Sequence, residues 1–392
     1  MTTNPQNVSC SESHSGRELH RAGWIIVDPS IVIENGYIEI ENGFIRGVHK
    51  GAPKEKGIDH GPGVLMPPLV NTHLHLELSA LKGCLPFDKG FKVWIKTLLE
   101  KRETLGQEKL IKEARKAVRN LIKSGNLYVG DISTLGITKP IIEDSALSGV
   151  CFHEFLGSGG QPFFAQKNDF ISFSVAGHAP HTSSPKLLKA LKQCAESNDL
   201  PFSIHVAESD DESEFIHDKK GQWADFLTDR GIDWSSWDIG SKTPVSYIND
   251  MGLFDPLTIA VHLLNVNNKD MEILAQSKTK VCVCPRSNQN LHGKLPDIEK
   301  MITAGIKPAL GTDSLASCDS LNIFDEMDFV QKHYPGIDPA VIFAMGTING
   351  ARALGIEGLT GILSKGRKAQ FLYRSVEAMN KKDLFQRIIS NE

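Results

Sequence analysis

The feature that most constrains the fold is a repeated pattern of short apolar segments separated by longer helical stretches. From about residue 63 onward, an apolar run of five to eight residues recurs eight times, and between the runs lie stretches with helical spacing of apolar residues. This alternation is typical of parallel strands joined by helical crossovers. The candidate strands span residues 64–71, 127–133, 150–155, 171–178, 201–206, 257–262, 280–284 and 307–313.

Eight such units predict an α/β chain built on a (β/α)8 barrel of the TIM type, a fold that usually occupies about 250 residues. We assign the barrel to residues 63–357. Residues 1–20 are polar and without periodicity, which predicts a mobile N-terminal arm with order beginning near Trp24.

The segments on either side of the barrel are short and rich in β-branched residues. Residues 21–62 contain Asn35-Gly36 and Asn42-Gly43, two dipeptides that suit tight hairpin turns. Residues 358–392 add one more β-rich stretch and a terminal helix, too little for a domain of their own. We therefore expect both segments to form one small composite β-sandwich domain.

Charge and composition exclude several classes of partner. The chain has 43 Lys and Arg against 47 Asp and Glu, so it has no general attraction to nucleic acid or anionic lipid. No apolar run approaches the roughly 18 residues of a membrane span, and the N-terminus lacks the pattern of a secretory signal. Its seven scattered cysteines suit a reducing compartment. We expect a cytoplasmic protein whose partner is a small molecule. The sequence is compatible with either a monomer or a homo-oligomer.

Histidine and aspartate residues recur where the candidate barrel strands end. His73 and His75 close the first strand, His205 lies in the fifth, His262 ends the sixth and Asp313 ends the eighth. In a barrel these ends meet at one face, where functional side chains gather. The two histidines of an H-x-H segment project from the same side of an extended chain, as chelation of one ion requires. The sequence therefore predicts a metal centre.

The donor set favours one divalent ion, zinc first and iron second. Two-metal sites in such barrels commonly use a bridging lysine in the fourth strand, and the segment SVAGHAPHT has none. Four protein ligands would exceed the usual three of a catalytic zinc site, so Asp313 is also a candidate weak ligand and base.

Glu208 follows His205 by three residues and is the candidate proton shuttle. A bound metal would lower the pKa of its water and yield a hydroxide nucleophile, while a nearby carboxyl group passes protons to a ring nitrogen or a leaving amine. His262 would orient the water or polarise the developing oxyanion. The alternatives are a solvated charge for Glu208 and a structural role for His262.

At this point the chain resembles the cyclic-imidate branch of the amidohydrolase superfamily, which includes S-adenosylhomocysteine and methylthioadenosine deaminases and chlorohydrolases. The resemblance runs from about residue 22 to 376. Its motifs, in order, are NTHLHLE, GHAPHTSSP, HVAES, VHLLN, CPRSN and GTDS.

The resemblance implies a mononuclear zinc or iron centre on His73, His75, His205 and Asp313, with Glu208 as proton shuttle and His262 beside the metal-bound water. It also implies that His178 approaches the substrate and that both chain ends pair in one β domain. The chain departs from the family at His181, where a tyrosine is usual, and at Gln370, where Gly-Lys-x-Ala-Asp usually ends in Asp. The first departure bears on what the pocket accepts.

Further residues are nominated for substrate contact. Glu77 could accept hydrogen bonds from ribose hydroxyls, or could be a buried structural carboxylate. Trp94 could stack on a purine, although core packing is the commoner role. Arg286 and Asn288 follow the seventh strand. Arg286 could form bidentate hydrogen bonds with a carboxylate, either the benzoate of an aminofutalosine or the carboxylate of a homocysteine.

The subfamily motifs NTHLHLELSALKG, GFKVWI and VGDIS most resemble aminodeoxyfutalosine deaminases of the menaquinone pathway. We expect hydrolytic deamination of a 6-aminopurine nucleoside by metal-bound hydroxide, with aminodeoxyfutalosine as the leading substrate. Deamination of S-adenosylhomocysteine or methylthioadenosine is the first alternative, and another chlorohydrolase-type displacement is the second. A non-enzymatic scaffold would be expected to have lost metal ligands, and this chain keeps all of them.

Overall fold

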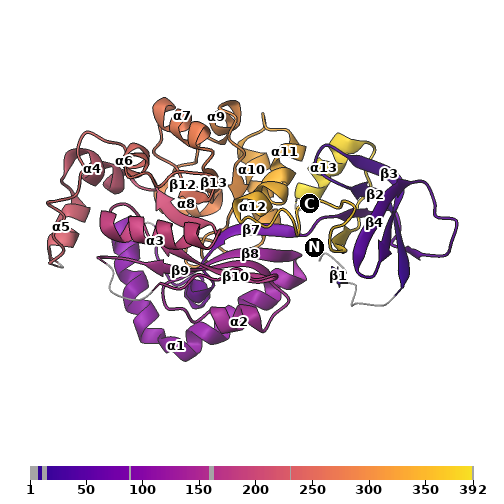
Figure 1. Ribbon diagram of the computed structural model, residues 1–392, viewed down its shortest axis with the longest axis horizontal. Helices are drawn as coiled ribbons and strands as arrows, with labels where there is room; N and C mark the ends of the chain where they lie inside the picture. The colour runs from indigo at the N-terminus through magenta and orange to yellow at the C-terminus, as the bar shows by residue number, and fades with distance from the viewer. Residues whose placement is uncertain (1–7, 11–15, 88–89, 159–162, 230, 391–392) are drawn as a thin grey trace.

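The computed structural model describes residues 8–10, 16–87, 90–158, 163–229 and 231–390. Two sheets organise the chain: a parallel sheet of eight strands and a mostly antiparallel sheet of seven. Figure 1 shows strands β2, β3 and β4 of the smaller sheet (indigo) at one end of the long axis, beside the larger helix-covered body. The predicted α/β class is confirmed.

The eight parallel strands follow one another in chain order and form a nearly closed barrel. Backbone N–H groups of Thr312 and Asp313 donate to the His73 carbonyl oxygen at 3.0 and 3.1 Å, so the last strand region meets the first. The strands are β7 (Leu69–Leu74), β8 (Asn126–Ser133), β9 (Ser148–Phe155), β10 (Ile171–Gly177), β11 (Phe202–Val206), β12 (Thr258–His262), β13 (Lys280–Val283) and β14 (Ala309–Leu310).

Helices follow most of these strands, and the apolar side chains of each helix pack against the barrel. In α3, for example, Leu187, Leu188 and Leu191 lie on one buried face, and the Ser184 hydroxyl caps the first turn. The helices are η1 (Leu76–Leu81, a 3-10 helix), α1 (Phe91–Lys123), α2 (Lys139–Glu143), α3 (Pro185–Ser197), α4 (Asp210–Asp218), α5 (Gln222–Asp229), α6 (Pro244–Asp250), α7 (Asn268–Ser277), α8 (Pro285–His292), α9 (Ile298–Thr303), α10 (Ile323–His333), α11 (Pro339–Met345), α12 (Ile348–Ala353) and α13 (Lys381–Ile389).

The smaller sheet joins strands from both ends of the chain, as predicted. Its strand order is β1-β15-β6-β2-β3-β4, with β5 paired to β2. Buried isoleucines of β2, β3 and β4 pack against Phe371 of the C-terminal strand. The strands are β1 (Val8–Cys10), β2 (Arg17–Ile26), β3 (Val32–Glu41), β4 (Phe44–Lys50), β5 (Ile58–Asp59), β6 (Val64–Met66) and β15 (Gln370–Arg374).

The first predicted barrel strand, 64–71, is in fact two strands that belong to different sheets. β6 joins the smaller sheet, and the barrel strand β7 starts at Leu69. Pro67 and Pro68 separate them because proline has no N–H with which to continue a strand ladder. The chain therefore passes into the barrel at this proline pair, several residues later than we expected.

Three other expectations about the chain ends need correction. β2 begins at Arg17, inside the segment predicted as a mobile arm; residues 1–7 and 11–15 of that segment lie outside the described residues. Asn42-Gly43 forms the predicted turn between β3 and β4, but Asn35-Gly36 lies within β3. Helix α13, assigned to the β domain, packs on the barrel helices instead, with the Phe385 ring 5.3 Å from that of Phe343.

The cysteines and the helices of the described residues bear on two further expectations. Free thiols are found at Cys84, Cys151, Cys194, Cys282, Cys284 and Cys318, and all of these but Cys84 and Cys194 are buried. No helix in the described ranges is long and apolar enough to cross a membrane.

Candidate metal centre

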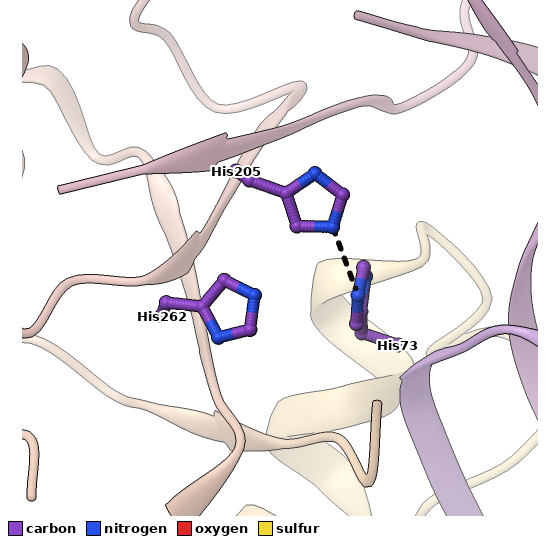
Figure 2. A group of neighbouring side chains, drawn as sticks. All are labelled: His73, His205 and His262. Carbon is purple, nitrogen blue, oxygen red and sulfur yellow. Dashed lines mark hydrogen bonds between the residues drawn. The ribbon is translucent and has the colours of Figure 1, made fainter. Parts of the chain in front are cut away.

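The four predicted metal ligands and His262 converge at the end of the barrel where the parallel strands finish. His73 and His75 lie at the end of β7, His205 lies in β11, His262 ends β12 and Asp313 follows β14. All five are buried. Figure 2 shows the rings of His73, His205 and His262 converging from three strands, with one ring nitrogen of His205 aimed at His73.

The spacing of the donor atoms fits a single divalent ion. The two Nε2 atoms of His73 and His205 are 3.3 Å apart, and Asp313 Oδ1 lies 3.5 Å from His75 Nε2. Zinc bonds of 2.0–2.1 Å at tetrahedral angles would separate two ligand atoms by about 3.3 Å. His73, His75 and Asp313 form one compact donor group, and His73, His205 and His262 form another.

Burial favours the neutral, metal-binding form of His73, His75 and His205. It lowers the pKa of His75 to about 3, even though the neighbouring Asp313 carboxylate acts in the opposite direction. The pKa of His73 is also lowered well below its usual value, by burial first and by the surrounding histidines second. A neutral imidazole offers a lone pair, so these rings suit a shared cation.

Two of the predicted ligands are held by partners that the sequence did not reveal. The Nδ1–H of His205 donates to the His178 carbonyl oxygen at 2.7 Å, which leaves Nε2 free to bind an ion. The Oδ2 atom of Asp313 accepts hydrogen bonds from the hydroxyls of Ser287 at 2.6 Å and Ser317 at 2.9 Å. Such outer contacts fix the tautomer and orientation of metal ligands.

The backbone at the site is unusual as well. Ala207, His262, Leu263 and Asp313 all have φ between 54° and 76°, in the left-handed region that residues with side chains rarely adopt. His262 and Asp313 belong to the two donor groups described above, and Leu263 directly follows His262. Strained backbone of this kind is maintained where the surrounding structure holds a functional geometry in place.

Glu208 lies where a proton shuttle would be needed. Its Oε1 atom is 3.6 Å from Nε2 of His262 and 3.3 Å from Nε2 of His292. Burial acts to raise the pKa of Glu208, but these two histidines outweigh it and lower the pKa overall. The Glu212 carboxylate accepts hydrogen bonds from the backbone N–H groups of Ala207 and Glu208 at 2.9 and 2.8 Å. The lowered pKa favours the ionised form of Glu208, and Glu212 holds the backbone of Glu208 in place.

Asn288 contacts His262 rather than open space. Its amide nitrogen is 3.0 Å from His262 Nδ1, and both side chains are buried. In this orientation the amide donates to Nδ1, which leaves the His262 proton on Nε2, facing Glu208. Asn288 is thus placed to orient His262, whereas the sequence nominated it for substrate contact.

A cavity of about 240 Å³ opens above the metal-site residues. Three of the residues nominated for substrate contact line it: Glu77, Trp94 and His178. The Glu77 carboxylate also accepts hydrogen bonds from residues 133–135, so it serves a structural purpose at the same time. Trp94 is buried and donates from Nε1 to the Ala316 carbonyl oxygen at 3.3 Å.

Arg286 does not line this cavity. Its guanidinium faces the Asp319 carboxylate and, at 3.7 Å, the carboxyl group of Glu326. The nomination of Arg286 for a substrate carboxylate therefore needs correction: α8 begins at Pro285, and the helical turn directs Arg286 away from the pocket. His181, the departure from the family pattern, does line the cavity, with its ring 4.3 Å from the ring of Trp223.

Sequence reasoning missed several residues around the cavity. His292 at the end of α8 contacts Glu208, and Arg102 of α1 lines the wall beside Glu77. Both lie on helices, away from the strand-end motifs. The helical recurrence of apolar residues in α1 was visible in the sequence, but the face that meets the pocket depends on how the helix docks.

Residues 158–383 match the model of the amidohydrolase family. This chain belongs to that family. It is 29% identical over 372 residues to a 5-methylthioadenosine/S-adenosylhomocysteine deaminase of Desulfitobacterium hafniense, covering 88% of this chain and 81% of the relative. It is 30% identical over 338 residues to an aminodeoxyfutalosine deaminase of Deinococcus radiodurans, covering 79% and 78%.

Solved structures show the same fold. Helicobacter pylori aminofutalosine deaminase, in complex with methylthio-coformycin, superposes with a TM-score of 0.83 at 22% identity, covering 95% of this chain and 96% of that one. An adenosine deaminase of Xanthomonas campestris with bound zinc gives a TM-score of 0.76 at 20% identity, covering 95% and 88%.

Proposed function

We propose that this amidohydrolase hydrolytically deaminates a 6-aminopurine nucleoside, with aminodeoxyfutalosine of menaquinone biosynthesis as the leading substrate. The observation that carries the proposal is the ionised Glu208 carboxylate beside His262, at the edge of a buried histidine and aspartate cluster. That combination supplies both a cation site and a proton carrier within one pocket. Relatives of this chain that carry deaminase names support the same reaction class.

The ion in this proposal is one divalent metal, zinc first and iron second, held by His73, His75, His205 and Asp313. When bound, it would act as a Lewis acid that activates water for attack. The neutral histidines and the serine-held Asp313 carboxylate suit such an ion. Asp313 Oδ1, which lies 3.5 Å from His75 Nε2, is available to the ion while Oδ2 is occupied by the two hydroxyls.

Glu208 carries the proton in this mechanism. Its carboxylate accepts a proton from the attacking water and delivers it to a ring nitrogen or to the departing amine. Water thereby replaces the amino group at C6, and the products are the 6-oxopurine nucleoside and ammonia. His262, oriented by Asn288, donates from Nε2 toward the oxygen as charge develops there.

His178 and Glu77 bind the nucleoside itself. His178 lines the cavity, its Nδ1 lies 2.6 Å from the Thr182 hydroxyl, and burial lowers its pKa to about 4. A neutral imidazole with one nitrogen engaged is left with the other to meet a purine ring nitrogen. Glu77 retains acceptor capacity beyond its bonds to residues 133–135, because a carboxylate offers about four lone-pair directions.

A panel of adenine nucleosides on zinc- or iron-reconstituted protein tests the proposal. We expect ammonia release and loss of the adenine absorbance maximum, with the highest kcat/KM for aminodeoxyfutalosine. Preference for S-adenosylhomocysteine or methylthioadenosine would move the chain to the first alternative. Metal-loaded protein that deaminates no member of the panel would refute the proposal, and turnover of chloro-substituted rings would then favour the chlorohydrolase alternative.

A further inference from the structure

One face of helix α1 forms a wall of the active-site cavity. Phe91, Trp94, Leu98 and Arg102 follow one another at intervals of three or four residues, so they lie along the same side of the helix, and all four line the cavity. The Phe91 ring is 4.7 Å from the ring of His292, which contacts Glu208. The stripe therefore begins near the proton shuttle.

The same stripe ends at a positive charge. From Phe91 to Arg102 the helix rises about 16 Å, at roughly 1.5 Å per residue. Between these ends the wall is apolar, with Trp94 and Leu98 buried. Among the described residues that line the cavity, Arg102 is the one Lys or Arg side chain. A ligand that extends along this wall passes from the reaction centre over an apolar surface to a guanidinium.

The Arg102 guanidinium has donors to spare. Two buried carboxyl groups feel its charge. Glu77 Oε1 lies 3.9 Å from Nη1, which is too long for a hydrogen bond, and the Arg102 charge acts to lower the pKa of Glu154. The Glu77 carboxylate is already engaged by residues 133–135, as described above. The Arg102 side chain keeps 23% of its surface exposed, so a ligand can reach it. An arginine in a pocket wall with five N–H donors is suited to hold a carboxylate through two parallel hydrogen bonds.

We propose that Arg102 binds a carboxylate carried at the end of an apolar arm on the nucleoside, and that it selects acid-tipped nucleosides over uncharged ones. The inference rests on the proposed deamination and names the substrate class of the same site. It moves to α1 the role for which the sequence nominated Arg286. The arm would lie along Trp94 and Leu98 while the purine sits beside Glu208.

Three substrates on the reconstituted enzyme separate the charge from the rest of the molecule: aminodeoxyfutalosine, its methyl ester and 5′-deoxyadenosine. For wild type, we expect kcat/KM to fall about 30- to 100-fold from the acid to the ester, the size of effect associated with a charge-assisted hydrogen bond. Arg102→Gln should lose a similar factor on the acid. On the ester and on 5′-deoxyadenosine it should change kcat/KM by no more than about threefold. Arg102→Lys should recover part of the loss on the acid.

Lys96→Gln is the matched control, because Lys96 lies on the same helix, is highly exposed and does not line this cavity. It should leave all three kcat/KM values unchanged. Equal losses on all three substrates in Arg102→Gln would mean that Arg102 acts only by steadying Glu77, and the inference would fail. Wild-type enzyme that treats acid and ester alike would overturn it without any variant.

The two proposals fail in distinguishable ways. If wild type deaminates 5′-deoxyadenosine and the ester as well as it does the acid, deamination stands and the role of Arg102 falls. If metal-loaded wild type deaminates no adenine nucleoside, the proposed function falls and the inference falls with it.

Discussion

The two walls of the active-site cavity are built by different means. On the strand-end side, three of the metal-site residues are held by polar partners: His205 has the His178 carbonyl, Asp313 has two serine hydroxyls and His262 has Asn288. On the α1 side, Trp94 and Leu98 are held mainly by apolar packing, to which Trp94 adds its hydrogen bond to the Ala316 carbonyl oxygen. The first wall holds atoms in position, and the second provides shape.

This difference suggests a division of labour. Hydrogen bonds have preferred directions, so the strand-end wall can keep donor atoms within the narrow tolerances of a metal centre. Apolar packing constrains volume more than direction, so the α1 wall can change its side chains with less effect on the chemistry. We therefore expect substitutions in the strand-end wall to affect kcat or metal affinity, and those in α1 to affect substrate choice and stability.

Glu208→Gln provides the largest expected effect. The amide keeps the shape of the side chain but cannot accept and pass on a proton, so kcat should fall by about 10³-fold or more. Metal content should stay that of wild type, since Glu208 is not a proposed ligand. Turnover rates and elemental analysis of the purified variant check both halves. Near-normal turnover would remove Glu208 from the mechanism.

Leu98→Ala tests the α1 wall. Leu98 is 8% exposed and packs in an apolar cluster with Trp94 and Leu291. We expect a loss of about 2–3 kcal/mol in the free energy of unfolding from removal of the buried side chain. Urea unfolding measures it. Metal affinity should be unchanged, and a clear drop in metal affinity would contradict the division between the two walls.

Ser317→Ala tests the opposite wall at smaller amplitude. Asp313 would keep the hydroxyl of Ser287 and lose that of Ser317, so its carboxylate should be less firmly oriented. Metal affinity should weaken by about tenfold, the lower end of what loss of such a contact causes. Competition with a chelator measures the change. Ser197→Ala, which removes an exposed hydroxyl bonded to the Gln193 carbonyl, is the control and should have no effect.

Glu326→Gln gives the smallest effect, and its sign depends on pH. Burial raises the pKa of Glu326 from 4.5 to about 8, although Arg286 acts to lower it. The native state thus holds a proton that the unfolded chain releases above pH 4.5, so the stability contributed by this group is lost as pH rises from 4.5 through 8. The neutral amide removes this dependence.

At pH 9, we expect the free energy of unfolding of Glu326→Gln to exceed that of wild type by about 1 kcal/mol. At pH 5 the two should be nearly equal. Thermal melts across that range test it. A variant that is destabilised equally at both pH values would show that the carboxyl group matters for its shape or hydrogen bonding rather than for its proton.

The strand-end residues could be predicted because two simple regularities coincide there. An H-x-H pair and single His or Asp residues fell at the ends of four predicted strands, and barrel strands end on one face. The same rule was wrong for Arg286, because the chain turns into α8 at Pro285 and a helix rotates successive side chains by about 100°. Nearness along the chain to a strand end does not decide direction once a helix begins.

Arg102 and His292 could not be predicted, for a related reason. Each lies on a helix, and the face that meets the cavity is set by tertiary docking, in α1 also by the break at Gly106, where φ is 72°. The split of the first strand, by contrast, follows from a local rule that could have been applied to the sequence. Pro67 and Pro68 have no N–H group to continue a strand ladder. Local rules of backbone chemistry could be applied to the sequence, and the packing of one element on another could not.

The seam of the barrel joins residues that are far apart along the chain. The Asn71 side-chain amide donates to the Thr312 hydroxyl at 2.8 Å, across a separation of 241 residues. The proposed ligands His73 and Asp313, which flank this pair, have almost the same separation along the chain. During synthesis, the first histidine pair therefore leaves the ribosome long before the aspartate that completes its donor set. Full coordination of an ion would thus mark a chain whose last barrel strand has been made and closed against the first.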